Sequence, residues 1–324
     1  MGNGDSEPST APAPGVGTAR VASAAPTPQL PRFEGARAFE TLTRLVEFGN
    51  RHYAAPRRPQ ALSMLEELLR AGTTQVSRQT FAATEKTSGE TYQLTNVIAR
   101  LHPERGNRVL LGSHFDTRLW AEEDADSTRR QQPIAGANDG SSGVAVLIEA
   151  LRLMATDPAF ANAGIDVVLF DGEEFGRPGP GGGDYCKGSI YLADHIDELY
   201  PDARPQAAIV LDMVGDRQLS IKREQSSQRP PSRGLNDLFW EVGRRHAPRV
   251  FDNRTRSTII DDHTPLQKIG VPAILVIDLE YPHWHTHQDT LDKVSPESLA
   301  IVGTTLLEVV HRLTHDGTAK KSTP

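Results

Sequence analysis

From residue 108 onward, short apolar runs alternate with segments of helical periodicity. The apolar runs cover residues 108–113, 165–170, 207–212 and 272–278, and the segments with helical periodicity cover 142–154, 188–198, 234–246 and 295–314. Strands that alternate with helices of this length are typical of a sheet with mostly parallel strands and helices on both faces. The sequence therefore predicts a three-layer α/β/α sandwich around a twisted, mixed but mostly parallel sheet.

Further elements of the same domain are predicted outside this alternation. Helices are expected near 37–49 and 58–71, and strands near 74–83, 91–101 and 217–222. The sequence has no internal repeat and no sign of a second domain, and a chain of 324 residues can bury a large single core. We therefore expect one domain over residues 33–315, followed by a frayed polar tail at 316–324.

Residues 1–32 differ in composition from the rest of the chain. They are rich in Pro, Ala, Ser, Thr and Gly and contain almost no large apolar side chain, which is typical of a disordered leader. The segment lacks the apolar region of a signal peptide, but it resembles the start of a processed bacterial lipoprotein, with Met1 in place of the lipid-bearing cysteine. We expect an exported protein, either lipid-tethered, periplasmic or secreted. A myristoylation pattern at Gly2 and Ser6 and a plain flexible tail are the alternatives.

Charge and composition exclude several kinds of partner. The 35 Lys and Arg residues are outnumbered by 42 Asp and Glu residues, the formal net charge is −7 and no basic block occurs, so nucleic acid is not an expected partner. No run approaches the roughly 20 apolar residues that span a bilayer. Because Cys186 is the only cysteine, an internal disulfide and a zinc site of four thiolates are both excluded. Any metal ion must bind His and carboxylate side chains.

Adjacent carboxylates directly follow one of the predicted strands. In VLFDGEEFG, at 168–176, three apolar residues are followed by Asp171, Glu173 and Glu174. Like charges this close repel, and buried carboxylates are unfavourable unless a cation or hydrogen-bond donors compensate them. The segment therefore predicts a bound cation near the end of this strand.

The other predicted strands also lead to potential metal ligands. In chain order these are His114 and Asp116 in SHFDT, Asp139 in GANDGSSG, Asp212 in VLDMVGD, and His283, His285 and His287 in EYPHWHTHQD. Each has an ordinary explanation when taken alone, and Asp139 suits a helix N-cap or a turn. Together they fall where ligands bind in open α/β sheets, outside the carboxyl ends of the strands. A cluster of carboxylates and imidazoles without thiolates predicts a catalytic zinc site.

The two adjacent glutamates are expected to have different roles. Neighbouring side chains cannot point the same way, so Glu174 is expected to bind the metal while Glu173 faces the substrate and moves protons. A Ser or Cys nucleophile is not expected, because the chain has no G-x-S-x-G motif and Cys186 lies in a glycine-rich context.

Four neighbouring features have simpler expected roles. Asp116 and His263 are expected to orient site residues from outside the metal ligands. The acidic run AEEDAD at 121–126 is expected to be a solvated loop, and the alternative is that it forms a rim of the pocket with Arg118 and Trp120. Trp240 is expected to lie in the core.

The motifs resemble those of a known family. SHFDT, GANDGSSG, FDGEEFG, VLDMVGD and DDHTPLQKIGVP followed by WHTHQDTLDKVSP occur in the order and spacing of the M28 zinc peptidase superfamily. Within it the chain looks most like a bacterial form of the animal-type glutaminyl-peptide cyclotransferases, or glutaminyl cyclases. The resemblance covers about residues 95–312. It implies a zinc aminopeptidase-like fold and a zinc enzyme that acts on the N-termini of peptides or proteins.

Two activities of the superfamily are the alternatives. The cyclase pattern implies conversion of N-terminal Gln to pyroglutamate with release of ammonia. In this site, one zinc ion would be bound by Asp139, Glu174 and His285. Glu173 would carry the proton, and Asp212 and Asp261 would belong to the hydrogen-bond network of Glu173. The aminopeptidase pattern implies hydrolysis by two zinc ions. Asp139 would bridge them, with His114 and Asp212 on one, Glu174 and His285 on the other, and Glu173 as general base.

Three residues favour the cyclase. Asp261 in DDHTP and Trp284 directly before His285 look like the cyclase arrangement, and Tyr281 takes the place of an aromatic pocket residue. Trp284 and Tyr281 are therefore expected to bind substrate.

Other features leave the alternatives open. SHFDT and GANDG also resemble aminopeptidase sequence, and the ligands for a second metal are present. A non-catalytic binding domain is disfavoured because every metal and base position is filled.

Overall fold

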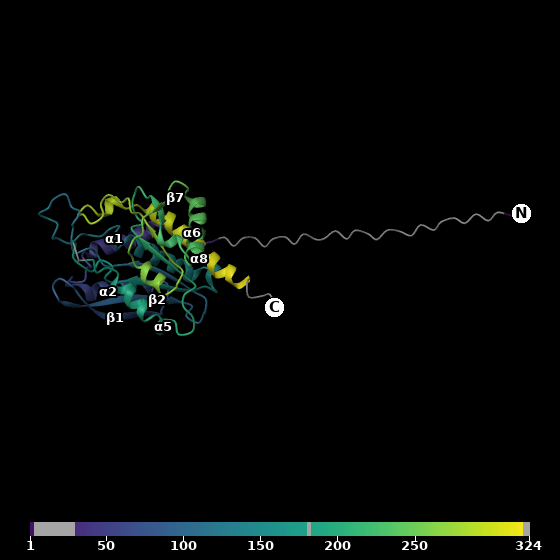
Figure 1. Ribbon diagram of the computed structural model, residues 1–324, viewed down its shortest axis with the longest axis horizontal. Helices are drawn as coiled ribbons and strands as arrows, with labels where there is room; N and C mark the ends of the chain where they lie inside the picture. Colours follow the sequence, from purple (N-terminus) through teal and green to yellow (C-terminus); the bar gives the residue numbers. More distant parts are fainter. Residues whose placement is uncertain (3–29, 180–182, 320–324) are drawn as a thin grey trace.

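The computed structural model describes residues 1–2, 30–179 and 183–319, and a six-stranded sheet forms its centre (Figure 1). The strand order is β1 (Val76–Thr84), β2 (Thr91–Leu101), β4 (Gly164–Phe170), β3 (Arg108–His114), β5 (Ala207–Asp212) and β8 (Ala273–Ile277). The pairs β3–β4, β3–β5 and β5–β8 are parallel, whereas β2 is antiparallel to both of its neighbours. The predicted mixed, mostly parallel sheet is confirmed.

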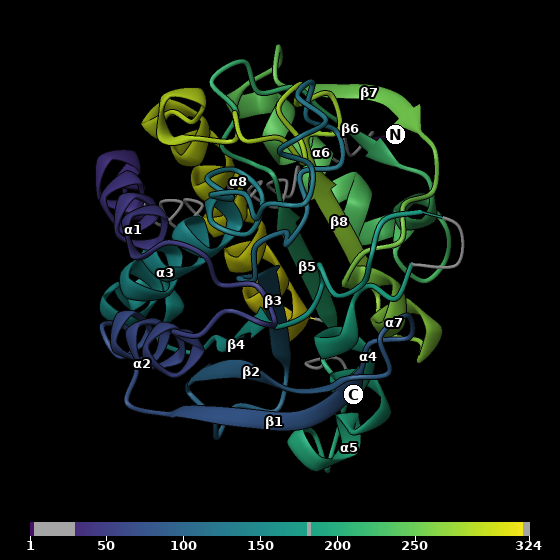
Figure 2. The same ribbon diagram turned by 90° about the vertical axis from the view of Figure 1, so that its left-hand side faces the viewer.

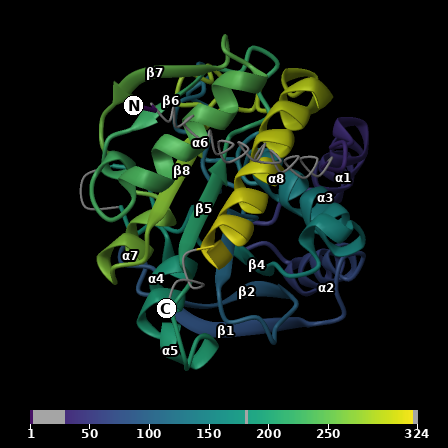
Figure 3. The same cartoon turned by 90° about the vertical axis from the view of Figure 1, so that its right-hand side faces the viewer.

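Helices cover both faces of the sheet (Figures 2 and 3). One face carries α1 (Gly35–Phe48), α2 (Arg58–Leu69), α3 (Ser142–Thr156), α6 (Arg233–His246) and α8 (Pro296–Ala319). The other carries α4 (Lys187–Asp194), α5 (Ile196–Leu199) and α7 (His263–Lys268). Within the residues that the structure describes, no helix is both long and apolar enough to span a membrane.

Burial on both faces explains why the central strands form continuous apolar runs. Leu111 of β3 faces the core beneath α3 and α8, and its neighbour Leu110 faces the core beneath α4 and α7. Successive side chains of a strand point to opposite faces, so a strand covered on both sides needs apolar residues at every position. The three-layer sandwich predicted from the alternating pattern is therefore the observed fold.

The structure differs from the sequence prediction in several places. The helix expected at 188–198 is divided into α4 and α5, and the strand expected at 217–222 is β6 (Ile221–Glu224). Its parallel partner β7 (Phe251–Arg256) was not predicted, because four of its six residues are exposed and it has no apolar pattern. Helix α7 was not predicted either, because its six residues are too few to show a helical period.

The two ends of the predicted domain fall near the limits of the described chain. Helix α8 continues to Ala319, beyond the predicted domain end at residue 315, so the first residues of the expected frayed tail are helical. Residues 320–324 of that tail lie outside the described residues. Most of the predicted leader, residues 3–29, also lies outside them.

A candidate metal site at the carboxyl ends of the parallel strands

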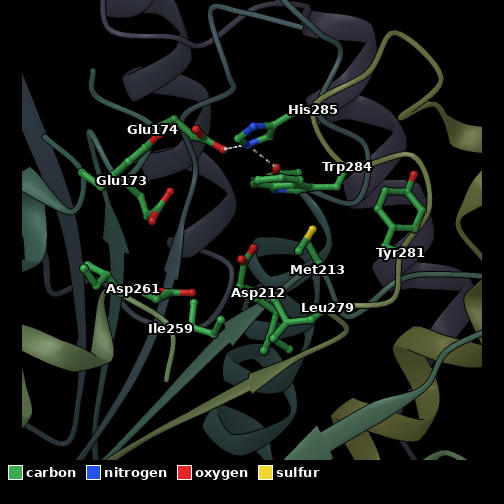
Figure 4. A pocket seen from close by; sticks show the side chains of 14 residues that line it. Glu173, Glu174, Asp212, Met213, Ile259, Asp261, Leu279, Tyr281, Trp284 and His285 are labelled. Carbon is green, nitrogen blue, oxygen red and sulfur yellow. Dashed lines mark hydrogen bonds and ion pairs between the residues drawn. The ribbon is translucent and has the colours of Figure 1, made fainter. Parts of the chain in front are cut away.

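The strand register places the carboxyl ends of the parallel strands at one edge. His114, the last residue of β3, pairs with Phe170 of β4, and Asp212, the last residue of β5, pairs with Ile277 of β8. The loops that follow these strands converge on a cavity of about 390 Å³ (Figure 4). Eight of the nine residues predicted for the site line this cavity: Asp139, Glu173, Glu174, Asp212, Asp261, Tyr281, Trp284 and His285. The ninth, His114, contacts Asp139 and Asp212.

The loop before α3 holds Asp139 in place. Gly140 has φ +82, and a Cβ atom there would lie 2.3 Å from the carbonyl oxygen of Asp116, so a side chain at this position would be strained and would clash. Asp289 accepts hydrogen bonds from the backbone N–H of Asn138 at 2.8 Å and of Asp139 at 3.2 Å. The buried carboxylate of Asp289, which the sequence did not single out, thus fixes the ligand loop.

Asp116 fixes the two glutamates that follow β4. Its two carboxylate oxygens accept the backbone N–H groups of Glu173 at 3.2 Å and of Glu174 at 3.1 Å. The glutamate side chains diverge: Glu174 points toward His285, and Glu173 points into the cavity (Figure 4). Asp116 therefore lies where the sequence predicted an orienting residue.

Two groups of three side chains have the composition and spacing of metal ligands. Asp139, Glu174 and His285 form one group, and His114, Asp139 and Asp212 form the other; within each, the potential ligand atoms lie within 4.8 Å of one another. Nε2 of His285 is 3.1 Å from Glu174 Oε1 and 3.6 Å from Asp139 Oδ2. Nε2 of His114 is 3.2 Å from Asp139 Oδ1 and 3.0 Å from Asp212 Oδ1. The geometry accommodates one metal ion or two.

The hydrogen bonds of the two histidines test whether a metal fits. Nδ1 of His114 donates to the carbonyl oxygen of Asp116 at 3.1 Å, and Nδ1 of His285 donates to Oε1 of Glu122 at 3.0 Å. In a neutral imidazole the other nitrogen, Nε2, is then an acceptor. Both Nε2 atoms face carboxylate oxygens, which are also acceptors, so a proton or a cation must lie between them. Zinc suits this donor set of imidazole nitrogen and carboxylate oxygen.

The electrostatics of the buried carboxyls also favour a cation. Burial, together with the charge of Glu174, raises the pKa of Asp139 to about 8. Burial alone would lower the pKa of His285, but the charge of Glu174 and hydrogen bonds to Glu122 and Glu174 raise it to about 10. Oε2 of Glu174 lies 3.1 Å from Arg118 as an ion pair, but it has no aligned hydrogen-bond partner among the described residues. Positive charge is thus favoured where the ligand atoms meet.

Glu173 lies in an environment suited to holding a proton. Burial and the charge of Glu174 raise its pKa well above the usual range. The thiol of Cys186 lies 3.5 Å from Oε1 of Glu173, a contact that the sequence did not reveal. Burial and the charge of Asp212 raise the pKa of Asp261 to about 7. Glu173, Asp212 and Asp261 line the same cavity (Figure 4).

Apolar and aromatic side chains form the rest of the cavity wall. Trp284 is 43% exposed, and its ring stacks on that of His285 with 3.8 Å between centroids. Tyr281 is buried and donates its hydroxyl to Asp289 at 2.7 Å, so that its ring borders the cavity. Ile260 is 72% exposed at the rim. Met213, Ile259, Ile277 and Leu279 complete the apolar wall.

Three predictions for neighbouring residues have different outcomes. The acidic run at 121–126 is more than a solvated loop, since Glu122 contacts His285 and Asp124 accepts from Nδ1 of His287 at 2.8 Å. His263 lies outside the cavity lining, where its Nε2 is 3.0 Å from Ser226 Oγ, and its orienting role stays a prediction. Trp240 lies in the core, as predicted.

Unusual backbone conformations gather around the cavity. Of the four non-glycine residues with positive φ in the described part of the chain, Cys186 (φ 61), Met213 (φ 45) and His285 (φ 53) line or contact the site. Such conformations are unfavourable for residues with a side chain and are concentrated at functional sites. The observation supports the location of the site independently of its charges.

The fold is an α/β sandwich with buried His, Asp and Glu side chains that could hold a metal ion at the carboxyl ends of its parallel strands. Residues 96–310 match peptidase family M28, and the chain belongs to this family. The family resemblance predicted from the motifs is therefore confirmed.

Individual relatives include both cyclases and peptidases. A glutaminyl-peptide cyclotransferase of Bothrops jararaca is 27% identical over 237 residues, which are 64% of this chain but only 62% of that protein. The crystal structure of a glutaminyl cyclase from Fimbriiglobus ruber is 30% identical, with a TM-score of 0.82 over 88% of this chain and 97% of that one. A leucine aminopeptidase precursor from Bacteroides thetaiotaomicron is 29% identical, with a TM-score of 0.81 over 87% and 98% of the two chains. The chain is thus an M28-family enzyme, and the choice of reaction depends on the chemistry of the site.

Proposed function

We propose that the protein is a zinc-dependent glutaminyl-peptide cyclotransferase, which converts an N-terminal Gln of peptides to pyroglutamate and releases ammonia. The observation that carries the proposal is the presence of Asp261 beside Asp212 and Glu173 in one cavity. Asp261 belongs to neither group of potential metal ligands. Burial raises the pKa of Asp261 to about 7 and that of Glu173 well above its usual range, so both carboxyls are suited to holding a proton. A reaction that moves one proton between two substrate nitrogens needs such groups.

Asp139, Glu174 and His285 would hold the zinc ion. When bound, zinc supplies Lewis-acid polarisation of the side-chain carbonyl of the substrate Gln. The Nδ1–H of His285 donates to Glu122 and leaves Nε2 directed at the ligand position.

The remaining steps fall to side chains of the cavity. The α-nitrogen of the substrate forms a bond to the Gln side-chain carbonyl carbon, and the bond from that carbon to the amide nitrogen breaks. Glu173 accepts a proton from the α-amine and returns it to the departing nitrogen, which leaves as ammonia. Asp261 and Asp212 hold the proton network beside Glu173. Because the substrate supplies the nucleophile, the protein needs only to bring the two groups together and exclude water.

The lining of the cavity agrees with a substrate that presents one side chain. Acidic groups and apolar residues such as Met213, Ile259 and Leu279 line the same cavity. Trp284 and Tyr281 provide aromatic surface beside the ligand His285, and we assign them to substrate binding. Apolar walls keep water from competing with the α-amine for the polarised carbonyl.

Aminopeptidase activity is the second candidate, and one observation favours it. His114, Asp139 and Asp212 form a second group with metal-ligand spacing, and a site with two metal ions suits attack by water on a peptide bond. In that case Asp212 would bind metal, and Glu173 would activate the water.

The products of the reaction distinguish the two activities. Purified zinc-loaded protein is incubated with a peptide that begins with Gln and with the matched peptide that begins with Leu, while ammonia and free amino acids are measured. We expect ammonia from the Gln peptide and no free Leu from the other. Free N-terminal amino acids without ammonia would support the aminopeptidase.

A further inference from the structure

The side of His285 that faces away from the predicted metal position contacts an acidic residue. Its Nδ1 lies 3.0 Å from Oε1 of Glu122, while its Nε2 faces Glu174 and Asp139 on the opposite side of the ring. Glu122 belongs to neither group of potential metal ligands, so its contact with the site passes through the imidazole.

A buried arginine holds Glu122 in this position. Arg118 donates from Nη2 to Oε1 at 2.6 Å, and from Nε to Oε1 at 3.0 Å and Oε2 at 3.2 Å. Its remaining nitrogen, Nη1, donates to the carbonyl oxygens of Glu174 and Gly176. Several hydrogen bonds to a planar guanidinium fix a carboxylate much more strictly than a single contact does. The orientation of Glu122 is therefore set independently of metal binding.

The same acidic segment also supports the backbone around His285. Asp124 accepts hydrogen bonds from the backbone N–H of His287 at 2.9 Å and from its Nδ1 at 2.8 Å. His285 itself has φ 53, a conformation that a residue with a side chain adopts only when its surroundings impose it. Residues 118–124 and 285–287 are thus held together at the strained position and directly after it.

From these contacts we infer that Glu122 is a positioning residue for the predicted metal ligand His285. It accepts the Nδ1–H, and it thereby fixes the tautomer and the direction of the ring so that the lone pair of Nε2 points to Glu174 and Asp139. Arg118 connects this support to the second ligand, because it also forms an ion pair with Glu174. The inference rests on the proposed function to the extent that His285 must bind a metal, but it holds for a cyclase and for an aminopeptidase alike.

The expected size of the effect follows from the chemistry of metal-bound histidines. A carboxylate that accepts the proton of the far nitrogen orients the ring and makes the ligating nitrogen more basic, and loss of such a partner typically weakens metal affinity about 10–100-fold. Glu122→Gln keeps the size of the side chain and removes its charge. Glu123→Gln makes the same chemical change one position along the chain, where the side chain is exposed.

The test measures the zinc dissociation constant of purified protein by competition with a chelator of known affinity. We expect Glu122→Gln to bind zinc about 10–100-fold more weakly than the unchanged protein, and Glu123→Gln to bind it equally well. Glu122→Asp keeps the charge and is expected to recover part of the loss. Circular dichroism at the assay temperature shows whether each variant is folded, because reduced stability lowers zinc affinity only through the unfolded fraction.

His285→Ala separates failure of the inference from failure of the proposed function. Normal zinc affinity in Glu122→Gln together with weakened binding in His285→Ala would overturn the role of Glu122 and leave the ligand assignment in place. Equal losses in Glu122→Gln and Glu122→Asp would trace the effect to disturbed packing and would also overturn it. Normal zinc affinity in His285→Ala would contradict the ligand assignment itself.

Discussion

Nε2 of His285 lies 3.1 Å from Oε1 of Glu174, and the far nitrogen of the same ring donates to Glu122. A neutral imidazole in this tautomer would direct a lone pair at a carboxylate, which is unfavourable in a buried site. A proton or a cation must therefore lie between them, and we propose that the pair are two ligands of one cation, together with Asp139.

The ligand assignment can be tested by replacing two histidines of the same loop. His285→Ala removes one of three ligands, so we expect zinc content and activity to fall together. His287→Ala leaves the potential ligand groups intact, because His287 binds Asp124, so one zinc per chain should remain. Metal analysis after dialysis measures both variants. A full complement of zinc in His285→Ala would mean that another residue is the ligand.

Replacing the proton carrier should separate folding from catalysis. Glu173→Gln keeps the size of the side chain but removes its basic oxygen, and Glu173 belongs to neither metal-ligand group. We expect a folded, zinc-loaded protein whose turnover is lower by roughly 10²–10⁴-fold, the usual contribution of a general acid–base residue. Turnover close to that of the unchanged protein would exclude Glu173 from this role.

The metal should stabilise the protein more at high pH than at low pH. Burial, with the charge of Glu174, raises the pKa of Asp139 to about 8, and burial, with the charge of Asp212, raises that of Asp261 to about 7. Such carboxyls bind more protons in the folded than in the unfolded chain, where they titrate near 4. The stability that they provide to metal-free protein is therefore complete below about pH 4 and is lost as the pH rises toward 7 and 8.

Zinc binding requires Asp139, which is the potential metal ligand of these two, in its ionised form, so protons and metal compete for it. We expect the melting temperature of chelator-treated protein to fall between about pH 5 and pH 8 relative to that of zinc-loaded protein. The difference between the two melting temperatures should widen steadily over this range. A constant difference would contradict the assignment of Asp139 as a ligand of the metal.

The exposed apolar rim should influence the second residue of the substrate. Ile260 is 72% exposed and lines the same cavity as Trp284, and an extended peptide whose first residue fills the cavity passes this rim. A partial apolar contact of about 1 kcal/mol corresponds to a change of about fivefold in KM. We expect Ile260→Ser to raise KM about fivefold for a Gln-Phe peptide and to leave a Gln-Gly peptide nearly unchanged. Ile190→Ser, at an exposed apolar residue of α4 outside the cavity lining, is the matched control.

Much of the site could be predicted because it depends on strand ends. Residues that end neighbouring parallel strands, such as His114 and Asp212, must lie at one edge of the sheet. The apolar runs and the side-chain period of the strands show from the sequence alone where each strand ends, and the carboxyl ends of parallel strands form that edge. Asp139 and Glu174 follow from the same argument, since each lies in a loop that leaves this edge.

The parts that could not be predicted depend on the paths of loops. Cys186 contacts Glu173 across 13 positions of the sequence, and Glu122 contacts His285 across 163. Neither segment has a period that would fix its path, and an acidic run such as AEEDAD is usually solvated. A signal was nevertheless present, because Arg118 lies four residues before Glu122, a spacing that suits an ion pair within a turn.

The number of zinc ions needed for full activity tests the central claim most directly. Metal-free protein is titrated with zinc while ammonia release from a Gln peptide and amino-acid release from a Leu peptide are measured in parallel. The cyclase account predicts that ammonia release reaches its maximum at one zinc per chain and that the Leu peptide stays intact. Activity that rises until two zinc ions are bound per chain, with release of free N-terminal amino acids, would contradict it.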